Sequence, residues 1–161
     1  MTTRYLRFVP PVCIGVLLFF TFRLYATSYF WLDDFTNLCR IESRTLGELL
    51  WVIVSPSPAH FRPVGMLFYW AALQLFDRNA FGYHLIMWAL HSVNVFLVYI
   101  VLKRLTDSRT GSAIGAMLYV FPAVFNDLFW SFGTIFELVG ASLFFVGLLV
   151  WHRRRERSLW F

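Results

Sequence analysis

Long apolar runs bounded by charged residues are the feature that most restricts what this chain can fold into. Four such runs cover residues 8–32, 81–102, 111–128 and 136–151. The first run would rise about 37 Å as a helix, which exceeds a bilayer hydrocarbon core of about 30 Å. Only 14% of the residues are charged and 59% are hydrophobic, whereas roughly 25% are charged in an ordinary soluble domain. The pattern predicts an all-α integral membrane protein with four transmembrane helices.

The basic residues predict which ends of the spans face the cytoplasm. With four spans, nine of the fourteen Lys and Arg residues lie on one side and seven of the nine acidic residues on the other. Short cytoplasmic loops are enriched in Lys and Arg, so both termini are expected in the cytoplasm and any chemistry on the outer face of the plasma membrane. This topology explains the net charge of +5 without nucleic acid as a partner. A cleaved signal peptide in place of the first span is the alternative, because Arg4 and Arg7 precede it and Ala26-Thr27-Ser28 is a weak cleavage site.

The outer loop, residues 33–80, contains two further apolar segments. Thr45 and Glu48 form a capping box, and apolar residues follow at the spacing of a one-sided helix, which predicts a surface helix over 46–54. Pro63 is placed as the first residue of a second helix, over 64–76. Thirteen residues are too few for an ordinary crossing, and a fifth span would put the later basic loops outside. We therefore expect this segment to lie at the membrane surface.

Asp33 and Asp34 directly follow the first predicted span, at the expected boundary between membrane and water. A carboxylate at this low-dielectric boundary can act as a general base or hold a divalent cation such as Mg²⁺ or Mn²⁺. The alternative is that the pair only ends the helix and opens an outer loop. Asp33 and Asp34 are therefore the candidate catalytic residues and the candidate cation ligands. No Cys and His pattern suggests zinc, and no disulfide is expected from Cys13 and Cys39.

Further substrate-binding candidates lie near the same outer boundary. His60 and Arg62 are in the outer loop, and a guanidinium near the headgroups is suited to bidentate capture of phosphate. Arg23 lies about 15 Å of helix rise before the acidic pair, so it is either a partner for an acid in the bundle or a phosphate ligand. Asp127 ends the third span and Glu137 opens the fourth. Contact with lipid headgroups, capping or packing is the alternative role for each.

One face of the second span is polar. His84, Trp88, His91 and Asn94 share that face, which should point into the bundle. The two histidines are about 10 Å apart along the helix axis, too far to bind one metal ion. Hydrogen bonds between helices are the expected role of this stripe.

Several short motifs follow one another along the chain in a distinctive order. They are Trp31-Leu32-Asp33-Asp34-Phe35, Phe61-Arg62-Pro63 with Phe81-Gly82, the two histidines and Asn94 followed by Leu97-Val98-Tyr99 and Lys103-Arg104, Pro122, and Trp130-Ser131-Phe132-Gly133. This order resembles the N-terminal part of GT-C class glycosyltransferases, especially the protein O-mannosyltransferases and the tetratricopeptide-repeat transmembrane mannosyltransferases.

The resemblance implies a membrane enzyme, or its N-terminal module, that transfers a sugar from a polyprenyl-phosphate-linked donor to an extracytoplasmic acceptor. It implies that Asp33 is the catalytic carboxylate, that Asp34 binds a metal ion or orients the substrate, and that Arg62 lies near the donor phosphate. Enzymes of this class have more spans, which leaves open whether the chain is complete or the first part of a split enzyme. The alternative function is that of a non-catalytic membrane subunit that binds a lipid-linked sugar or a partner membrane protein.

Overall fold

The computed structural model describes residues 9–42, 45–55, 62–120 and 131–158, and within these ranges every regular element is a helix. The helices are α1 (Val9–Ala26), α2 (Leu32–Ile41), α3 (Leu46–Val54), α4 (Pro63–Phe76), α5 (Ala80–Thr106), α6 (Arg109–Val120), the short 3-10 helix η3 (Phe132–Thr134) and α7 (Ile135–Ser158). The predicted all-α fold class is confirmed for this part of the chain.

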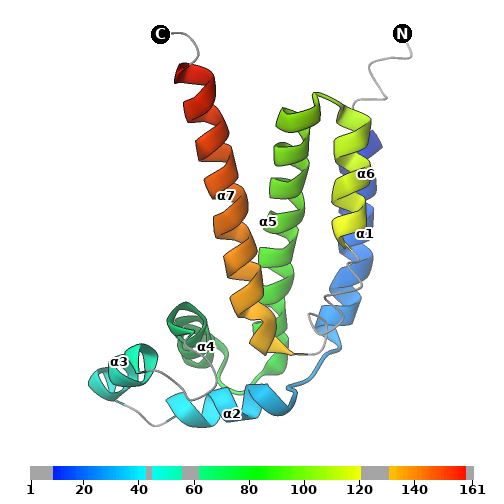
Figure 1. Cartoon of the computed structure of the whole chain (residues 1–161). Coiled ribbons are helices and arrows are strands. Elements are labelled where there is room, and N and C mark those ends of the chain that lie inside the picture. Colours follow the sequence, from blue (N-terminus) through cyan, green and yellow to red (C-terminus); the bar gives the residue numbers. More distant parts are fainter. Residues whose placement is uncertain (1–8, 43–44, 56–61, 121–130, 159–161) are drawn as a thin grey trace.

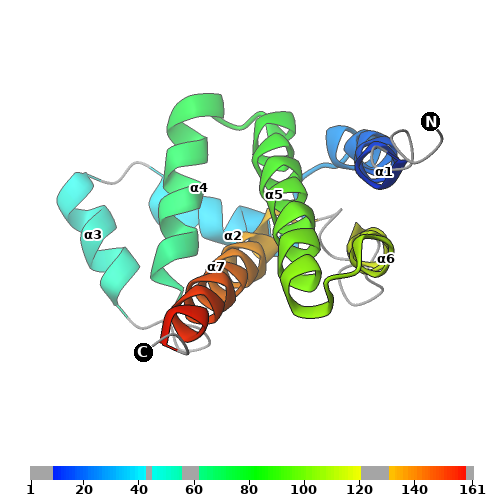
Figure 2. The same ribbon diagram turned by 90° about the horizontal axis from the view of Figure 1, so that it is seen from above.

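The helices form an upright bundle that stands on a platform. Helices α1, α5, α6 and α7 form the bundle, whereas α2, α3 and α4 lie across one end of it (Figure 1). Helix α1 begins, α7 ends and the turn between α5 and α6 lies at the other end. Figure 2 shows α5 between α1 and α6 on one side and α4 and α7 on the other. Helix α5 is therefore the central element of the bundle.

Two segments of the described chain are long and apolar enough to cross a membrane, namely α5 and the stretch from Phe132 to Arg155 that contains most of α7. Two shorter apolar helices lie within α1 and α4. Only 11% of the most apolar stretch of α7 is buried by the rest of the chain, against 33% for α5. Leu143, Phe144 and Trp151 are accordingly exposed on α7. These two helices carry the apolar surface that the predicted membrane spans require.

The polar stripe of α5 makes the predicted hydrogen bonds between elements. His84 Nε2 lies 3.3 Å from the Tyr29 carbonyl, Trp88 Nε1 donates to the Leu18 carbonyl at 3.0 Å, His91 Nε2 lies 3.2 Å from the Val120 carbonyl, and Asn94 donates to the Leu138 carbonyl at 2.9 Å. The stripe thus connects α5 to α1, to the segment after α1, to α6 and to α7. In apolar surroundings such bonds hold helices together where hydrophobic burial contributes little.

The first helix ends at Ala26, so the prediction of one continuous helix over residues 8–32 is wrong at its C-terminal end. Thr27 and Ser28 donate their hydroxyls to carbonyls of the last turn, at 2.9 Å and 2.7 Å. Trp31 is extended, and Asp34 accepts its backbone N–H at 2.8 Å. An acid that accepts this N–H starts a new helix. Helix α2 was not predicted, because the residues before it continue the apolar run.

Both predicted surface helices of the outer loop are present as helices. Helix α3 spans the predicted residues 46–54, and α4 begins at Pro63 and ends at Phe76. The capping box is also confirmed, since Thr45 N donates to Glu48 Oε2 at 2.8 Å and Glu48 N to Thr45 Oγ1 at 3.4 Å. Leu49 is buried in the core. Helix α3 therefore packs against α4 and α2 through the face that carries Leu49.

The later helices differ from the predicted spans mainly in length. Helix α5 extends the predicted 81–102 at both ends, and α7 continues past residue 151 to Ser158 because Arg and Glu favour helix and no breaker intervenes. The helix predicted over 111–128 begins two residues earlier in the structure, at Arg109, and is described up to Val120. Residues 121–128 lie outside the described part of the chain.

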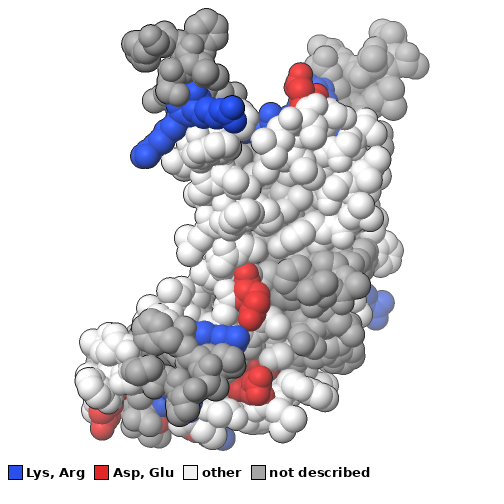
Figure 3. All heavy atoms as spheres, viewed as in Figure 1, with Lys and Arg blue, Asp and Glu red and all other residues white. Residues whose placement is uncertain are grey.

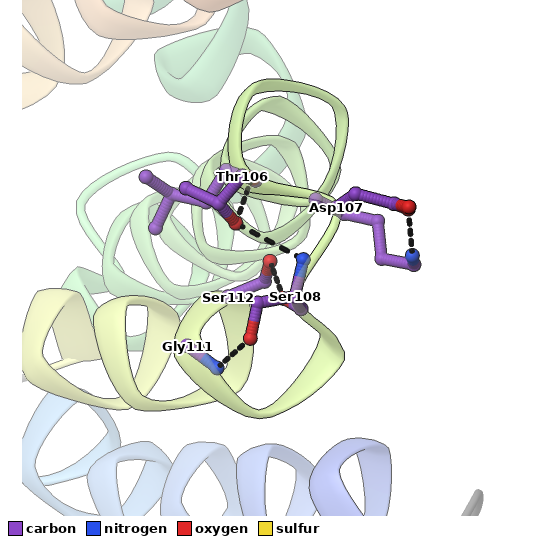
Figure 4. Close-up of polar contacts among 7 residues, drawn as sticks. Thr106, Asp107, Ser108, Gly111 and Ser112 are labelled. Atoms are coloured by element: carbon purple, nitrogen blue, oxygen red, sulfur yellow. Dashed lines mark hydrogen bonds and ion pairs between the residues drawn. The ribbon is translucent and has the colours of Figure 1, made fainter.

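The turn between α5 and α6 is built from short polar side chains (Figure 4). Asp107 ends α5 in the left-handed conformation, with φ of 49°, and its carboxylate pairs with Lys103 at 3.1 Å. Ser108 then accepts the backbone N–H of Gly111 at 3.1 Å, which caps the start of α6. The turn keeps α5 and α6 antiparallel and puts Lys103 and Arg109 at the same end of the bundle.

Gly65 lets α4 approach the start of α7, which gives a test of the packing. A Cβ at this position would lie 1.7 Å from two ring atoms of Phe136. Gly65→Ala is therefore expected to lower the free energy of unfolding by about 1–3 kcal/mol, measured by thermal unfolding of the purified protein in detergent. Gly140→Ala is the matched control, because the equivalent Cβ on α7 meets nothing within 4 Å. Equal unfolding temperatures for the two variants would contradict the packing of α4 against Phe136.

Candidate functional site

Asp34 is a fully buried carboxylate in the first turn of α2. It is the centre of a hydrogen-bond network with five donors. Oδ1 accepts from Tyr69 Oη at 2.6 Å, Gly133 N at 2.9 Å and Ser131 Oγ at 3.1 Å, and Oδ2 accepts from Trp31 N at 2.8 Å and Phe132 N at 3.1 Å. The network joins the start of α2 to α4 and to the turn that precedes α7.

The five donors use the whole hydrogen-bonding capacity of the Asp34 carboxylate. An ionised carboxylate offers about four lone-pair positions, so no position is left for a cation. The buried charge also acts on its neighbours, because desolvation and the Asp34 carboxylate raise the pKa of Tyr69 above its usual range. Tyr69 therefore stays protonated and keeps donating its hydrogen. This geometry makes Asp34 a positioning residue and does not fit a cation shared by Asp33 and Asp34.

Asp33 precedes Asp34 but has the opposite environment, since its side chain is exposed. Successive residues of a helix point about 100° apart, so one acid of the pair can face the core while the other faces outward. The Cβ of Asp33 lies 3.9 Å from where a side chain on Gly133 would begin, and its charge acts on Tyr69. Asp33 thus lies at the surface beside the network that Asp34 organises.

Arg62, directly before α4, and Glu137, in the first turn of α7, lie next to each other. Their side chains form an ion pair, with 3.5 Å between Arg62 Nη2 and Glu137 Oε1, and both are partly exposed. The guanidinium also lies over the ring of Phe136, 4.7 Å from its centroid. Figure 3 shows acidic and basic side chains close together near the platform end of α7. The Phe136 ring therefore holds the Arg62 guanidinium beside the first residues of α4 and α7.

Asp33 and the Arg62–Glu137 pair both lie beside the start of α7, since the Asp33 Cβ is next to Gly133 and Arg62 pairs with Glu137. The buried Tyr69 lies beneath them, because its ring contacts that of Phe136 at 6.2 Å, its hydroxyl donates to Asp34, and the Asp33 charge acts on it. The region offers the exposed Asp33 carboxylate, which can act as a base, and the Arg62 guanidinium, which can bind an anion. This cluster of Asp33, Arg62 and Glu137 is the candidate site.

Of the remaining predicted site residues, Arg23 is described and lies apart from this cluster. Arg23 is exposed near the C-terminal end of α1, which packs mainly against α5 and α6. His60 and Asp127 lie outside the described residues. Among the residues that are described, no three His, Cys, Asp or Glu side chains gather as a metal site would need.

Sequence reasoning missed Tyr69 and the backbone donors of the turn before α7. Tyr69 is fully buried, lies in an apolar helix and is surrounded by other aromatic residues, so nothing in the pattern marked it. Ser131 and Gly133 belong to the Trp-Ser-Phe-Gly motif that was noted for its resemblance alone. Their partner could not be read from the sequence, because 97 positions separate Ser131 from Asp34.

Comparisons with family models, with curated proteins and with solved structures found no match to this chain. The site itself consists of the buried Asp34 network, the exposed Asp33 beside it, and the Arg62–Glu137 pair over Phe136.

Asp34 and Asp33 are expected to respond differently to the same substitution. Asp34→Asn replaces one acceptor oxygen with an NH₂ group that faces other donors, so the free energy of unfolding should fall by about 2–4 kcal/mol. Asp33→Asn, the matched control, should change it by less than about 0.5 kcal/mol because that side chain is exposed. Thermal unfolding in detergent measures both. Two variants of equal stability would mean that Asp34 does not hold the platform together.

Proposed function

We propose that this chain is a membrane glycosyltransferase, or the N-terminal module of one, that moves a sugar from a polyprenyl-phosphate-linked donor to an acceptor on the outer face of the membrane. The observation that supports it best is the cluster of Asp33, Arg62 and Glu137 at the platform end of the bundle. A base and a phosphate-binding cation side by side are what this transfer requires.

The membrane arrangement we propose has four crossings, made by α1, α5, the predicted span to which α6 belongs, and α7. Helices α5 and α7 have the length and apolarity for it. The basic residues Lys103, Arg104, Arg109 and Arg153–Arg155 lie near the end of α5, the start of α6 and the end of α7, at the end of the bundle opposite the platform. By the positive-inside rule that end faces the cytoplasm, and the platform faces outward. The candidate site then lies at the outer boundary of the plasma membrane.

The proposed reaction is a single displacement at the anomeric carbon of the donor sugar. Asp33 takes the proton of the acceptor hydroxyl while the hydroxyl oxygen forms a bond to that carbon. The bond between the carbon and the donor phosphate oxygen breaks, and its electron pair stays on the phosphate. Arg62 stabilises the resulting negative charge through charge-assisted hydrogen bonds, and Glu137 holds the guanidinium in place. Asp34 takes no part in bond making and keeps the surrounding backbone fixed.

Reporter fusions test the four-crossing arrangement. Fusions that end at Asn79 and Gly133 are expected to report an external location, and fusions that end at Asp107 and Arg155 a cytoplasmic one. The reason is the separation of the basic end from the platform end. Alkaline phosphatase and green fluorescent protein as paired reporters give opposite signals at each position. A cytoplasmic signal at Gly133 would contradict the arrangement.

Asp33→Asn tests the reaction. The substitution keeps the size of the side chain and removes the base, so transfer of radiolabelled sugar from a polyprenyl-phosphate donor should fall about 100- to 10,000-fold. Asp107→Asn is the matched control, because this exposed aspartate lies at the opposite end of the bundle and Asn tolerates its positive φ. It should keep wild-type activity.

Measuring donor binding alongside sugar transfer distinguishes an enzyme from a subunit that only binds the donor. Arg62→Gln should weaken binding of the donor, whereas Asp33→Asn should leave it almost unchanged because Asp33 acts on the acceptor. If the wild-type chain binds the donor and Asp33→Asn transfers sugar equally well, Asp33 is not the base. A chain that binds the donor through Arg62 but transfers nothing would instead be the non-catalytic subunit.

A further inference from the structure

A hollow opens between α2 and the end of α1. It is a partly open pocket of about 420 Å³ between the end of α1, the residues that follow α1, α2, and the turn between α4 and α5. Its volume is in the range of ligand pockets, roughly 300–1,000 Å³. Phe35 lines it from α2 and is two positions after Asp33, about 200° around the helix. The pocket is therefore separate from the cluster of Asp33, Arg62 and Glu137.

Aromatic rings form its wall. Phe30, Phe35 and Phe81 line the pocket, and the Phe30 and Phe35 rings meet edge to face with centroids 6.0 Å apart. The adjoining surface is also apolar, with Tyr29 81% exposed and Trp31 59% exposed. Exposed Tyr and Trp side chains in a membrane protein gather at the level of the lipid headgroups. Under the proposed function, the wall of the pocket faces the part of the bilayer where headgroups meet acyl chains.

Among the described residues that line the pocket, Arg78 is the cation, and one acid is paired with it while a second acts on it through its charge. Arg78 lines the pocket from the turn between α4 and α5, and its guanidinium forms an ion pair with Glu42 at the end of α2. Glu42 and, less strongly, Asp77 raise the pKa of Arg78 above its usual value. The Arg78 side chain is nevertheless 68% exposed, and a guanidinium has five N–H donors. It can therefore bind a second anion while the pair with Glu42 persists.

The charges at this place select among lipid headgroups. Arg78 contributes +1 and Glu42 and Asp77 contribute −1 each, so the three sum to −1. A phosphate alone would be attracted by Arg78 but repelled by the two acids. A headgroup that carries a phosphate and, a few bonds away, an ammonium would satisfy the cation and the acids together. Only an ammonium with N–H bonds can donate hydrogen bonds to the carboxylates.

We propose that this pocket binds a zwitterionic phospholipid with a primary ammonium headgroup, phosphatidylethanolamine. The phosphate binds to Arg78, the ammonium to Glu42 and Asp77, and the glycerol and first acyl carbons lie against Phe30, Phe35 and Phe81. The start of α5 adds a favourable dipole for the phosphate. The proposal rests on the membrane location given under the proposed function, but not on sugar transfer.

Native mass spectrometry of the purified chain in detergent tests the proposal. Phosphatidylethanolamine, phosphatidylcholine and phosphatidylglycerol with identical acyl chains are added in turn, and the lipid-bound fraction is measured. We expect phosphatidylethanolamine to bind at least about 10-fold more tightly than either of the others, since one to two charge-assisted hydrogen bonds distinguish them. Tighter binding of phosphatidylglycerol, or equal binding of the three lipids, would overturn the proposal.

Variants separate the two halves of the headgroup. Arg78→Gln should weaken phosphatidylethanolamine binding about 10-fold, and Asp77→Asn together with Glu42→Gln should remove the preference over phosphatidylcholine. Arg104→Gln, an exposed cation at the other end of the bundle, is the control and should bind as wild type. An unchanged affinity of Arg78→Gln for phosphatidylethanolamine would overturn the proposal. Because no sugar donor is present, a negative result here is distinct from inactivity of the Asp33 site.

Discussion

A single buried carboxylate connects the parts of this molecule that lie far apart in the chain. Asp34 accepts hydrogen bonds from the start of its own helix, from Tyr69 on α4 and from three groups of the turn before α7. A buried charge is tolerated only when its hydrogen-bonding capacity is satisfied. The platform can therefore form only when α2, α4 and the start of α7 come together at once. The positions of Asp33, Arg62 and Glu137 all follow from that assembly.

Two adjacent aspartates thus have different roles, and their sequence does not say which is which. Before α2 is known, Asp33 and Asp34 are an acidic pair after an apolar run, and both are candidates for chemistry. The difference arises because α2 is a new helix whose first turn directs Asp34 inward and Asp33 outward. The start of α2 was hidden because Phe30 and Leu32 prolong the apolar run, although the Phe30 ring packs against Tyr83 of α5.

Short sequence patterns predicted those parts of the fold that depend on neighbouring residues alone. The capping box placed α3, Pro63 placed the start of α4, and the helical period of the polar stripe showed which face of α5 points inward. The partners of Asp34 and Arg62 could not be predicted, since they depend on contacts between distant segments. Neither Tyr69 nor Phe136 differs in pattern from the other aromatic residues around it, yet one fixes the acid and the other the cation.

The start of α7 is held from two directions, which explains how a bundle with so little buried surface on that helix can present a defined site. Below, the turn before α7 is bound to Asp34. Above, Asn94 of α5 donates to the Leu138 carbonyl at 2.9 Å and accepts from Ser142 at 2.6 Å. Glu137 lies between these two anchors. Its position therefore depends on these buried polar bonds together with the buried Ile135 and Leu138 beside it, and not on packing along the rest of α7, where Leu143, Phe144 and Trp151 are exposed.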